Sequence, residues 1–592
     1  MADTIPARLF AQAAARPAAP AYHHKVDGEY RMTSWAEYAA QVRAAGRSLL
    51  ALGFEPGQIT TILGFNRPEW VILDVATMAA GGAPAGIYAT SSPDEVQYIV
   101  GHAESPLILV ENAAQIAKVL EVRDRLPHLK TIVTMEGAVP SDDPMVLTWT
   151  EFLEKGSDVS DADLDARIAA LEPDGLATLI YTSGTTGPPK GVMLTHKNLT
   201  WTAAGAMELL PLENDDRTVS YLPLSHIAEQ MFSIHLPITV GWSVYYAESI
   251  EKLAENLKEV RPTIFFAVPR VWEKFHAAVS AKLAESTGIK HKIGAWAQGV
   301  GRRHVDFVVN GRTPPLGLKI QHGIANALAF KKVKDAMGLD KARIAATSAA
   351  PISQEILEFF AGFDLPIVEI YGQSEGTGPT TANGHGAIRF GSVGKAFPGC
   401  EVKVADDGEI LLKGGNVFAG YYKDARATAD TLVDGWLHSG DLGSFDDDGF
   451  LYITGRKKDI IITAGGKNIA PSNLELAIKD NLLVSEAVVI GDRRKYLTAL
   501  ITLDAERVAE FAAEHGISGP VHHSDRLQKE IQATIDGMND KLARVEQVKK
   551  FTILPRELTI DDGELTGTLK VKRNVVSEHF SDVIDGMYAE EG

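Results

Sequence analysis

The sequence YTSGTTGPPKG, residues 181–191, lies between two apolar runs at 176–180 and 192–194 that predict β-strands. The glycines of this stretch lack a Cβ, so their backbone N–H groups can come close to a bound anion. They are Gly184, Gly187 and Gly191. Four hydroxyl side chains add hydrogen-bond donors. They are Thr182, Ser183, Thr185 and Thr186. Since Lys190 adds a positive charge, the stretch predicts a polyphosphate-binding loop between two strands.

This loop differs from a Walker A loop, because Pro188 and Pro189 precede Lys190 and no helix N-terminus is offered to the phosphates. It resembles instead the signature loop of the adenylate-forming superfamily, which comprises acyl-CoA synthetases, luciferases and peptide-synthetase adenylation domains. The resemblance implies that the loop binds ATP with Mg²⁺, and that Thr186 is both a catalytic residue and a metal ligand. The alternative is a surface loop that is merely rich in glycine and threonine.

The length and composition of the chain exclude several classes of protein. At 592 residues it exceeds the roughly 250 to 300 that one hydrophobic core supports, so at least two domains are expected. The net charge of −19 repels phosphates and makes a nucleic-acid partner unfavourable. Cys400 is the only cysteine, which excludes an intrachain disulfide and indicates a reducing compartment. The histidine pairs at 23–24 and 522–523 lack partners at metal-site spacing, so we expect no protein-bound zinc.

The sequence predicts neither a signal peptide nor a membrane-spanning helix. Charged residues and prolines are scattered through the first twenty residues. The most apolar window, 71–89, is interrupted by Asp74, two glycines and Pro84, whereas a span needs about 20 apolar residues. We therefore expect a cytoplasmic protein. The sequence does not determine its oligomeric state.

The periodicity of apolar residues predicts a mixed α/β fold. Helices are expected at 35–52, 69–80 and 94–102, and strands at 60–63, 107–111 and 131–135. This alternation is typical of parallel α/β layers, and residues 399–452 follow as a small antiparallel β-subdomain. Together with the resemblance, these patterns predict an N-terminal adenylation domain of stacked α/β subdomains at 1–456. A small, mobile α+β domain is predicted at 457–592.

A second motif, PLSHIAEQ at 223–230, follows a predicted strand at 217–222. His226 comes just after the strand end, where open α/β sheets place their ligand sites. A single histidine at such a place is often structural. Here it matches the histidine or aromatic position of the superfamily's next motif, beside the acyl site, and we therefore assign His226 to the catalytic site.

The string PRVWEKF at 269–275 resembles the long-chain acyl-CoA synthetase branch of the superfamily. A helical, locally basic segment at 283–342 follows it. Its basic residues include Arg302, Arg303, Lys319, Lys331, Lys332 and Lys334. The segment is either a solvated helix face or a surface that contacts an anionic membrane, into which fatty acids partition.

The motif SAAP at 348–351 follows a predicted strand at 342–347. The resemblance places Ala349, Ala350 and Pro351 against the adenine of ATP, where small residues let a flat base approach the backbone. Ser348 departs from the family pattern, since glycine is frequent at its position.

The motif YGQSEGTG at 371–378 follows the next predicted strand, 366–370. By the resemblance, Tyr371 offers a flat face to the adenine, and Gly372 and Ser374 belong to the same nucleotide site. Glu375 is assigned as a catalytic residue and as an oxygen ligand of Mg²⁺.

Two further motifs lie near the predicted domain boundary. In HSGDLG at 438–443, Asp441 can accept hydrogen bonds from both ribose hydroxyls. In GRKKDIIITAGGKNIAPSNLE at 455–475, Arg456 can pair with phosphate or ribose oxygens, and Lys458 matches the family's hinge position. Gly465 and Gly466 are assigned to the passage of the pantetheine arm of CoA.

The last motif, GELTGTLKVKR at 563–573, contains Lys570 at the position of the family's catalytic lysine. The family usually has SGK there, and the TLK found here is similar to long-chain members. The ordered motifs imply an enzyme that activates a fatty acid with ATP and transfers it to CoA. Three alternatives stay open: an enzyme that stops at the adenylate or uses a carrier protein or another acid, a luciferase-like oxygenase, and a non-catalytic nucleotide-binding protein.

Overall fold

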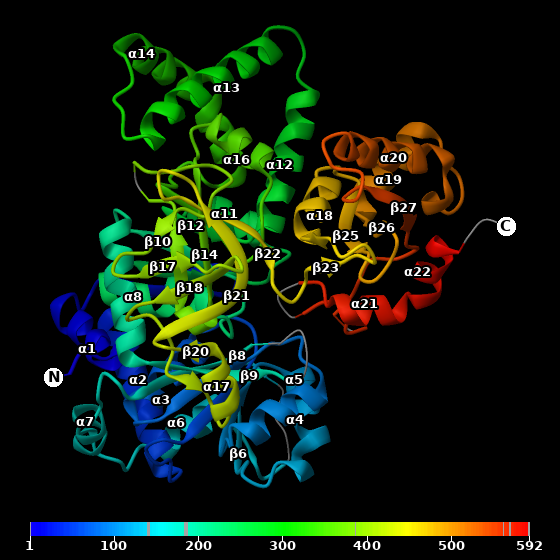
Figure 1. The fold of residues 1–592 in the computed structure, drawn as a ribbon. Coiled ribbons are helices and arrows are strands. Elements are labelled where there is room, and N and C mark those ends of the chain that lie inside the picture. Colours follow the sequence, from blue (N-terminus) through cyan, green and yellow to red (C-terminus); the bar gives the residue numbers. More distant parts are fainter. Residues whose placement is uncertain are drawn as a thin grey trace. The chain divides into compact units, whose positions relative to one another are not determined.

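The computed structural model describes residues 2–138, 143–182, 188–384, 386–560, 562–566 and 570–589. The chain forms two compact units (Figure 1). The first comprises Met1–Ala350, Leu357–Lys403 and Leu411–His438, and the second comprises Pro351–Ile356, Val404–Ile410 and Ser439–Gly592.

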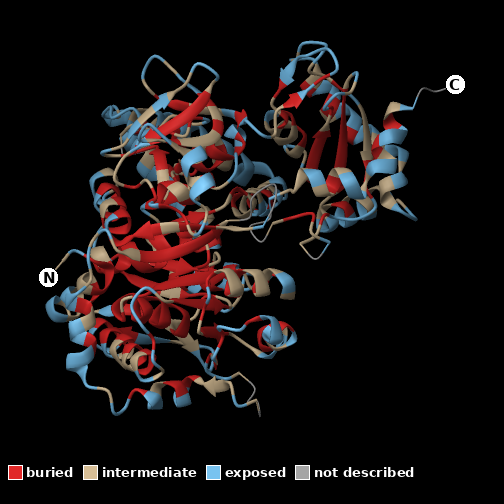
Figure 2. Cartoon of the chain, turned by 60° about the horizontal axis from the view of Figure 1, so that its bottom comes forward, coloured by how far each residue is buried: buried red, intermediate tan, exposed pale blue. Residues whose placement is uncertain are grey.

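The first unit contains an eight-stranded sheet with strand order β19-β9-β8-β4-β3-β5-β6-β7. The bounds are Gly420–Tyr421 (β19), Lys190–Thr195 (β9), Leu176–Thr182 (β8), Ala83–Ile87 (β4), Ile59–Leu63 (β3), Leu107–Val110 (β5), Thr131–Thr134 (β6) and Val146–Thr148 (β7). The strands from β8 to β7 pair in parallel, whereas β9 is antiparallel to both of its neighbours. β3 and β4 are buried along their whole length, as expected for parallel strands covered on both faces. Figure 2 shows buried strands in red in the interior of the protein.

Three helices around this sheet begin within one residue of their predicted starts: Trp35–Ala51 (α2), Pro68–Ala79 (α3) and Pro93–His102 (α4). Three more, which the sequence analysis did not predict, are Ala113–Val122 (α5), Trp149–Lys155 (α6) and Asp161–Ala169 (α7). Capping boxes fix the first turns of α2 and α4, through Ser34 with Glu37 and Ser92 with Glu95. α3 is apolar nearly all round and is buried, and α2 packs against α3, α6 and α7. The predicted helices and strands of this region are confirmed.

Two further sheets of the first unit carry the later motifs. A five-stranded sheet has the order β12-β13-β14-β15-β16, with bounds Ile264–Ala267, Ile344–Thr347, Ile367–Gln373, Gly378–Ala382 and Lys395–Ala396. A four-stranded sheet has the order β10-β11-β1-β2, with bounds Arg217–Ser220, Ser243–Tyr246, Pro20–Val26 and Glu29–Ser34. Because β12, β13 and β14 are parallel, their carboxyl ends share one edge of the sheet.

The basic segment is helical, as predicted. It follows Pro269–Ala284 (α12) and contains Gly288–Val309 (α13), Leu316–Ala325 (α14), a π-helical turn at Asn326–Phe330 (η3) and Lys331–Met337 (α15). Gln354–Ala361 (α16) follows β13. Across the described ranges, no helix combines the length and the hydropathy that crossing a membrane requires.

The predicted antiparallel β-subdomain is also present. Its strands are Glu401–Val404 (β17), Glu409–Lys413 (β18), Leu432–Val433 (β20), Trp436–Phe445 (β21) and Leu451–Arg456 (β22). The C-terminal part of the second unit has a three-stranded sheet of Val484–Ile490 (β25), Leu497–Leu503 (β26) and Val548–Ile553 (β27), and a hairpin of Ile461–Ile462 (β23) and Asn468–Ile469 (β24). Helices Pro471–Lys479 (α18) and Asp525–Asn539 (α20) pack on its core, and Ala505–His515 (α19), Arg573–His579 (α21) and Ser581–Tyr588 (α22) complete it. The predicted α/β fold class is confirmed.

Candidate active site

The predicted phosphate loop connects two antiparallel strands. Thr182, the last residue of β8, pairs with Lys190, the first residue of β9. The loop therefore begins and ends at neighbouring positions of the large sheet. Five of the predicted loop residues lie outside the described residues: Ser183, Gly184, Thr185, Thr186 and Gly187.

The YGQSEGTG motif forms the end of β14 and a short turn. A bulge follows Tyr371, and a Cβ on Gly372 would lie 1.6 Å from the carbonyl oxygen of Gly378, so only glycine fits there. Ser374 is buried at the start of a single 3₁₀ turn, and Glu375 follows it half-buried. The turn ends at Thr377, which has a positive φ of 52°. Local backbone geometry therefore fixes the place of Glu375.

Tyr421 connects this turn to the phosphate loop. Its hydroxyl donates to Glu375 Oε1 at 2.7 Å, and the Nζ of Lys190 lies 4.9 Å from the centroid of its ring. Tyr421 is held in place because β19 pairs with β9, opposite Val192. Burial, with the nearby charge of Glu375, raises the pKa of Tyr421 well above its usual value, so the phenol stays protonated and donates. One side chain thus contacts residues from two predicted motifs.

Sequence reasoning missed Tyr421, because it lies about 45 residues beyond the motif that it supports. The only local signal is a glycine before two tyrosines, Gly420 to Tyr422, which is common in surface loops as well as strands. The contact depends on the pairing of β19 with β9, and that pairing is a tertiary feature.

Replacing Tyr421 with phenylalanine is expected to lower kcat/KM for MgATP about 10-fold, or roughly 1.4 kcal/mol, because the hydrogen bond to the Glu375 carboxylate is lost while the ring stays. Initial rates of pyrophosphate release at varied MgATP measure this effect. Tyr422→Phe is the matched control, since it removes a neighbouring hydroxyl. Equal rates for the wild type and the Tyr421 variant would contradict the role given to Tyr421.

The PLSH motif is held by a buried polar network. The side-chain amide of Asn66 donates to Ser220 Oγ at 2.8 Å and to the Leu222 carbonyl at 2.7 Å. Glu229 Oε1 accepts from Ser220 and Ser233 hydroxyls at 2.7 and 2.6 Å. Burial raises the pKa of Glu229 to about 7, although these hydrogen bonds lower it. The network fixes the chain on both sides of His226.

His226 is half-buried and begins helix α9 (Ile227–Gln230). Its Nδ1 accepts from the backbone N–H of Ala228 at 3.2 Å. The Nδ1 atom therefore carries no proton, and the proton of a neutral ring is on Nε2. The segment follows the carboxyl end of β10, as the sequence predicts.

The SAAP motif continues from the carboxyl end of β13, beside β14. Ala349 has a positive φ of 77°, a conformation that favours glycine. The side chain of alanine is a single methyl group, which is small enough to fit there. The hydroxyl of Thr347, just before the motif, is buried without a hydrogen-bond partner among the described residues. Ala349 and Ala350 belong to the first unit, and Pro351 begins a short segment of the second.

In the second unit, Asp441 and Arg456 face each other across the antiparallel strands β21 and β22. The Nε of Arg456 donates to Asp441 Oδ1 at 2.9 Å. The carboxylate is 9% exposed and the guanidinium 47% exposed. The structure therefore brings together two residues that the sequence assigned to the same nucleotide.

Lys458 lies in an exposed turn directly after β22. The N–H of Asp459 donates to the Arg456 carbonyl at 3.0 Å, which places Lys458 at the third position of the turn. The preceding Lys457 is anchored by Asp407 at 2.7 Å and Glu409 at 3.0 Å. The chain is thus fixed on one side of the predicted hinge.

Gly465 and Gly466 lie in the exposed turn between β23 and β24. Gly466 has a positive φ of 77°, and its N–H donates to the carbonyl of Thr463 at 2.8 Å. No Cβ added at Gly466 would meet a described atom within 4 Å, so the backbone there is open to an approaching ligand.

Lys570 is exposed at the closing end of a short loop whose residues 567–569 lie outside the described ranges. The N–H of Lys570 donates to Thr566 Oγ1 at 3.0 Å, and the N–H of Thr566 donates to the Lys570 carbonyl at 2.8 Å. Glu564, two residues before Thr566, is itself fixed by ion pairs. Its Oε1 lies 2.6 Å from Nη2 of Arg556 and 3.1 Å from Nδ1 of His579. Burial alone would raise the pKa of Glu564, but these hydrogen bonds outweigh burial and bring it to about 2.

Comparisons with known proteins give the chain its family. Residues 9–422 match the family described as "AMP-binding enzyme", and residues 458–592 match "AMP-binding enzyme C-terminal domain". The chain is 41% identical to long-chain-fatty-acid–CoA ligase ACSBG2 of Xenopus laevis, over 96% of this chain and 81% of that one. It is 37% identical to long-chain-fatty-acid–CoA ligase FadD15 of Mycobacterium bovis, over 100% of this chain and 98% of that one.

Solved structures support the fold alone, because their sequence identities are low. The adenylation domain of carboxylic acid reductase from Segniliparus rugosus superposes with a TM-score of 0.76 at 18% identity, over 99% of this chain and 94% of that one. o-Succinylbenzoate CoA synthetase of Bacillus subtilis gives 0.69 at 22%, over 96% and 97%. From the matched domains and the full-length relatives, the chain belongs to the AMP-binding enzyme family, in the branch of the long-chain fatty acid–CoA ligases, and is an AMP-forming acid–thiol ligase.

Proposed function

We propose that this protein converts a long-chain fatty acid, ATP and CoA into acyl-CoA, AMP and pyrophosphate. The observation that carries the proposal is the identity of 36% or more, over nearly the whole chain, to relatives named long-chain-fatty-acid–CoA ligases. A second observation supports this proposal. Lys190 and Glu375, both assigned to MgATP binding, contact the same buried side chain, that of Tyr421.

In the first step, a carboxylate oxygen of the fatty acid attacks the α-phosphorus of ATP. The bond from that phosphorus to the bridging oxygen breaks, and pyrophosphate leaves with the electron pair. Lys190 and Lys570 offset the negative charge that accumulates on the phosphate oxygens. The half-buried carboxylate of Glu375, with one oxygen engaged by Tyr421, suits Mg²⁺, and Thr186 would be the second ligand. When bound, Mg²⁺ neutralises phosphate charge.

The remaining predicted residues bind the nucleotide and the acyl group. Tyr371, Gly372 and Ser374 contact the adenine together with the turn of Ala349, Ala350 and Pro351. Asp441 accepts hydrogen bonds from the ribose, and Arg456, its ion-pair partner, orients the carboxylate. His226 lies beside the reacting acyl carboxylate, with its Nδ1 accepting from Ala228 and the proton of its neutral ring on Nε2. Thr182, Ser183, Gly184, Thr185 and Gly187 cradle the phosphates.

In the second step, the thiolate of CoA attacks the acyl carbonyl carbon, and the bond to AMP breaks. We propose that residues 457–592 act as a mobile domain on an adenylation domain of residues 1–456, and that the chain turns about Lys458 between the steps. The backbone of Gly465 and Gly466 then lines the path of the pantetheine arm, since it is exposed and lacks side chains. The reaction takes place in the cytoplasm, where ATP and CoA are available.

Pyrophosphate release with MgATP tests this function across carboxylic acids from acetate to oleate, with and without CoA. Sustained, CoA-dependent turnover that peaks at long chains is the expected result. A single burst that CoA does not prolong would instead identify an acyl-adenylate ligase. Absence of pyrophosphate release with every acid would favour a non-catalytic nucleotide-binding protein.

We further propose that the basic helices contact an anionic membrane, from which the fatty acid is drawn. Residues 286–334 contain nine basic side chains and a single acidic one, Asp306, in a chain of net charge −19. The basic residues are Lys290, Lys292, Arg302, Arg303, Arg312, Lys319, Lys331, Lys332 and Lys334. This local excess of positive charge complements anionic lipid headgroups.

An exposed apolar row lies within the same segment. Leu316, Ile320, Ile324 and Leu328 recur at every fourth residue of α14 and η3, with 75%, 58%, 48% and 44% of their surfaces exposed. Side chains four residues apart share one face of a helix. An apolar helix face bordered by lysines is the arrangement that inserts into the interfacial region of a bilayer.

Substituting both Ile320 and Ile324 with glutamate is expected to weaken binding to vesicles of phosphatidylcholine and phosphatidylglycerol about 10-fold or more, because apolar contact is lost and charge is repelled. Co-sedimentation of the full chain with these vesicles measures the effect. Ile250→Glu is the matched control, since Ile250 is 57% exposed outside the segment. Absence of wild-type binding, or equal binding by the double variant and the control, would refute membrane contact.

A further inference from the structure

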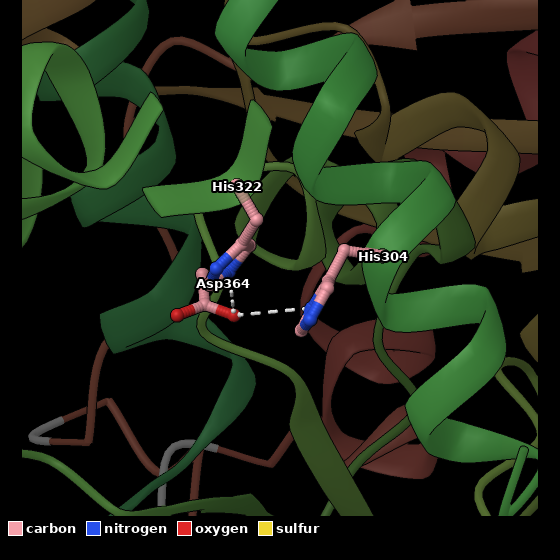
Figure 3. A group of neighbouring side chains, drawn as sticks. All are labelled: His304, His322 and Asp364. Carbon is pink, nitrogen blue, oxygen red and sulfur yellow. Dashed lines mark ion pairs between the residues drawn. The ribbon is translucent and has the colours of Figure 1, made fainter. Parts of the chain in front are cut away.

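Three side chains from separate elements meet in the first unit, away from every predicted motif. His304 comes from α13, His322 from α14, and Asp364 from the turn between α16 and β14. The Nε2 of His322 lies 2.9 Å from Asp364 Oδ1, and the Nδ1 of His304 lies 3.9 Å from the same oxygen. Both ring nitrogens lie near this one carboxylate oxygen (Figure 3), and the three donor atoms lie within 4.8 Å of one another.

The two nitrogens are buried, yet neither makes a hydrogen bond within the described part of the chain. A buried polar atom without a hydrogen bond is costly, so its retention needs an explanation. The distance of His322 to Asp364 suits a hydrogen bond, but the angle does not. Two imidazole nitrogens and one carboxylate oxygen therefore lie within 4.8 Å of one another, and the nitrogens make no hydrogen bond with described residues.

We propose that His304, His322 and Asp364 form a binding site for a divalent transition-metal ion. Two imidazoles and one carboxylate are donors that Zn²⁺, Co²⁺ and Ni²⁺ prefer, whereas Mg²⁺ and Ca²⁺ prefer oxygen alone. The side chains are 16%, 20% and 28% exposed, which leaves room for water as a further ligand. The site is distinct from the Mg²⁺ position assigned to Glu375.

Two features of the cluster set the affinity of the site. The imidazole rings stack with centroids 3.7 Å apart and planes at 21°, so they must rotate apart before both nitrogens can bind in the plane of their rings. Lys334 lies 3.4 Å from Oδ2, the other oxygen of Asp364, and donates to the Asp364 carbonyl at 3.3 Å. Lys334 orients the carboxylate so that Oδ1 faces the imidazoles, but its positive charge opposes a second cation. We therefore expect weaker binding than in a zinc site without such a cation.

The bound metal would join α13 to α14, the helix that presents the exposed apolar row. The ligands come from both helices and from the turn before β14, so the ion would fix the helix pair to the five-stranded sheet. A structural role of this kind needs no substrate. The proposal therefore stands independently of the fatty acid activation described above.

Titration of the full chain with Co²⁺, after treatment with EDTA and its removal, tests the site without reference to activity. The expected result is visible absorption that saturates at one ion per chain, together with a rise in Tm that Zn²⁺ reproduces and Mg²⁺ does not. His304→Ala and His322→Ala, measured separately, are expected to weaken Co²⁺ binding about 100-fold each. His291→Ala, at an exposed histidine of α13, is the matched control.

Co²⁺ affinities are compared only among variants whose Tm without metal equals that of the wild type, because such variants are correctly folded. If one alanine variant does not fold, His304→Gln or His322→Gln replaces it, because glutamine keeps the size and polarity of the side chain. Wild-type protein that gains neither absorption nor Tm overturns the proposal. Binding that survives in both histidine variants at wild-type affinity overturns it as well.

Discussion

Replacing Lys570 with alanine is expected to slow acyl-adenylate formation about 10²- to 10³-fold, the usual effect of removing one preorganised charge donor from a transition state. The loss should fall on adenylation alone. Thioester formation from supplied acyl-adenylate should stay nearly unchanged, because the proposed turn about Lys458 withdraws Lys570 from the adenylate before CoA attacks. Pyrophosphate release measures the first step, and acyl-CoA formation from synthetic acyl-adenylate measures the second.

The Lys570→Ala substitution leaves the backbone hydrogen bonds of this position available. Lys570 is held by its backbone, through the paired hydrogen bonds with Thr566, and the loop is anchored by the ion pairs of Glu564. The substitution removes neither of these backbone hydrogen bonds, so we expect the backbone at Thr566 and Lys570 to stay in place. Lys572→Ala, two residues further on, is the control for a general loss of positive charge. Equal damage to both steps would show that Lys570 is not the adenylating lysine.

The second large effect is expected from Lys458→Pro, which should preserve adenylation and reduce thioester formation about 10²-fold or more. Lys458 occupies the third position of a turn closed by the Asp459 N–H and the Arg456 carbonyl. Proline fixes φ near −65° and restricts the preceding residue, so the chain would lose the freedom to rotate there. A misplacement of about 1 Å between CoA and the adenylate is enough to cost 10²-fold.

Single-turnover assays separate the two steps in this variant, and Lys458→Ala controls for the lysine side chain. The alanine variant keeps the φ freedom of the position and should turn over normally. Lys457 needs to stay paired with Asp407 and Glu409 in both variants, which a comparison of Tm values checks. Normal overall turnover in the proline variant would remove the hinge role from Lys458.

The sequence predicted much of the fold because the signals involved are local. The helix at 94–102 follows from a capping box and a proline at its first position, and the structure places α4 at Pro93–His102. The strands on both sides of the phosphate loop follow from apolar runs interrupted by glycine and proline, and they form β8 and β9. The order of the motifs identified the family, and the comparisons confirmed it.

Tertiary structure decided the contacts that join these elements. Tyr421 reaches Glu375 only because β19 pairs with β9, and Asn66 reaches the PLSH segment only because two sheets pack together. The histidines of the proposed metal site share no motif, and the spacing rules that found no zinc ligands in the sequence apply to ligands close together along the chain. Short-range patterns set the backbone of each element, whereas long-range packing sets which side chains meet. The sequence by itself therefore determined the family and the elements of this protein, and the tertiary structure decided how those elements combine into sites.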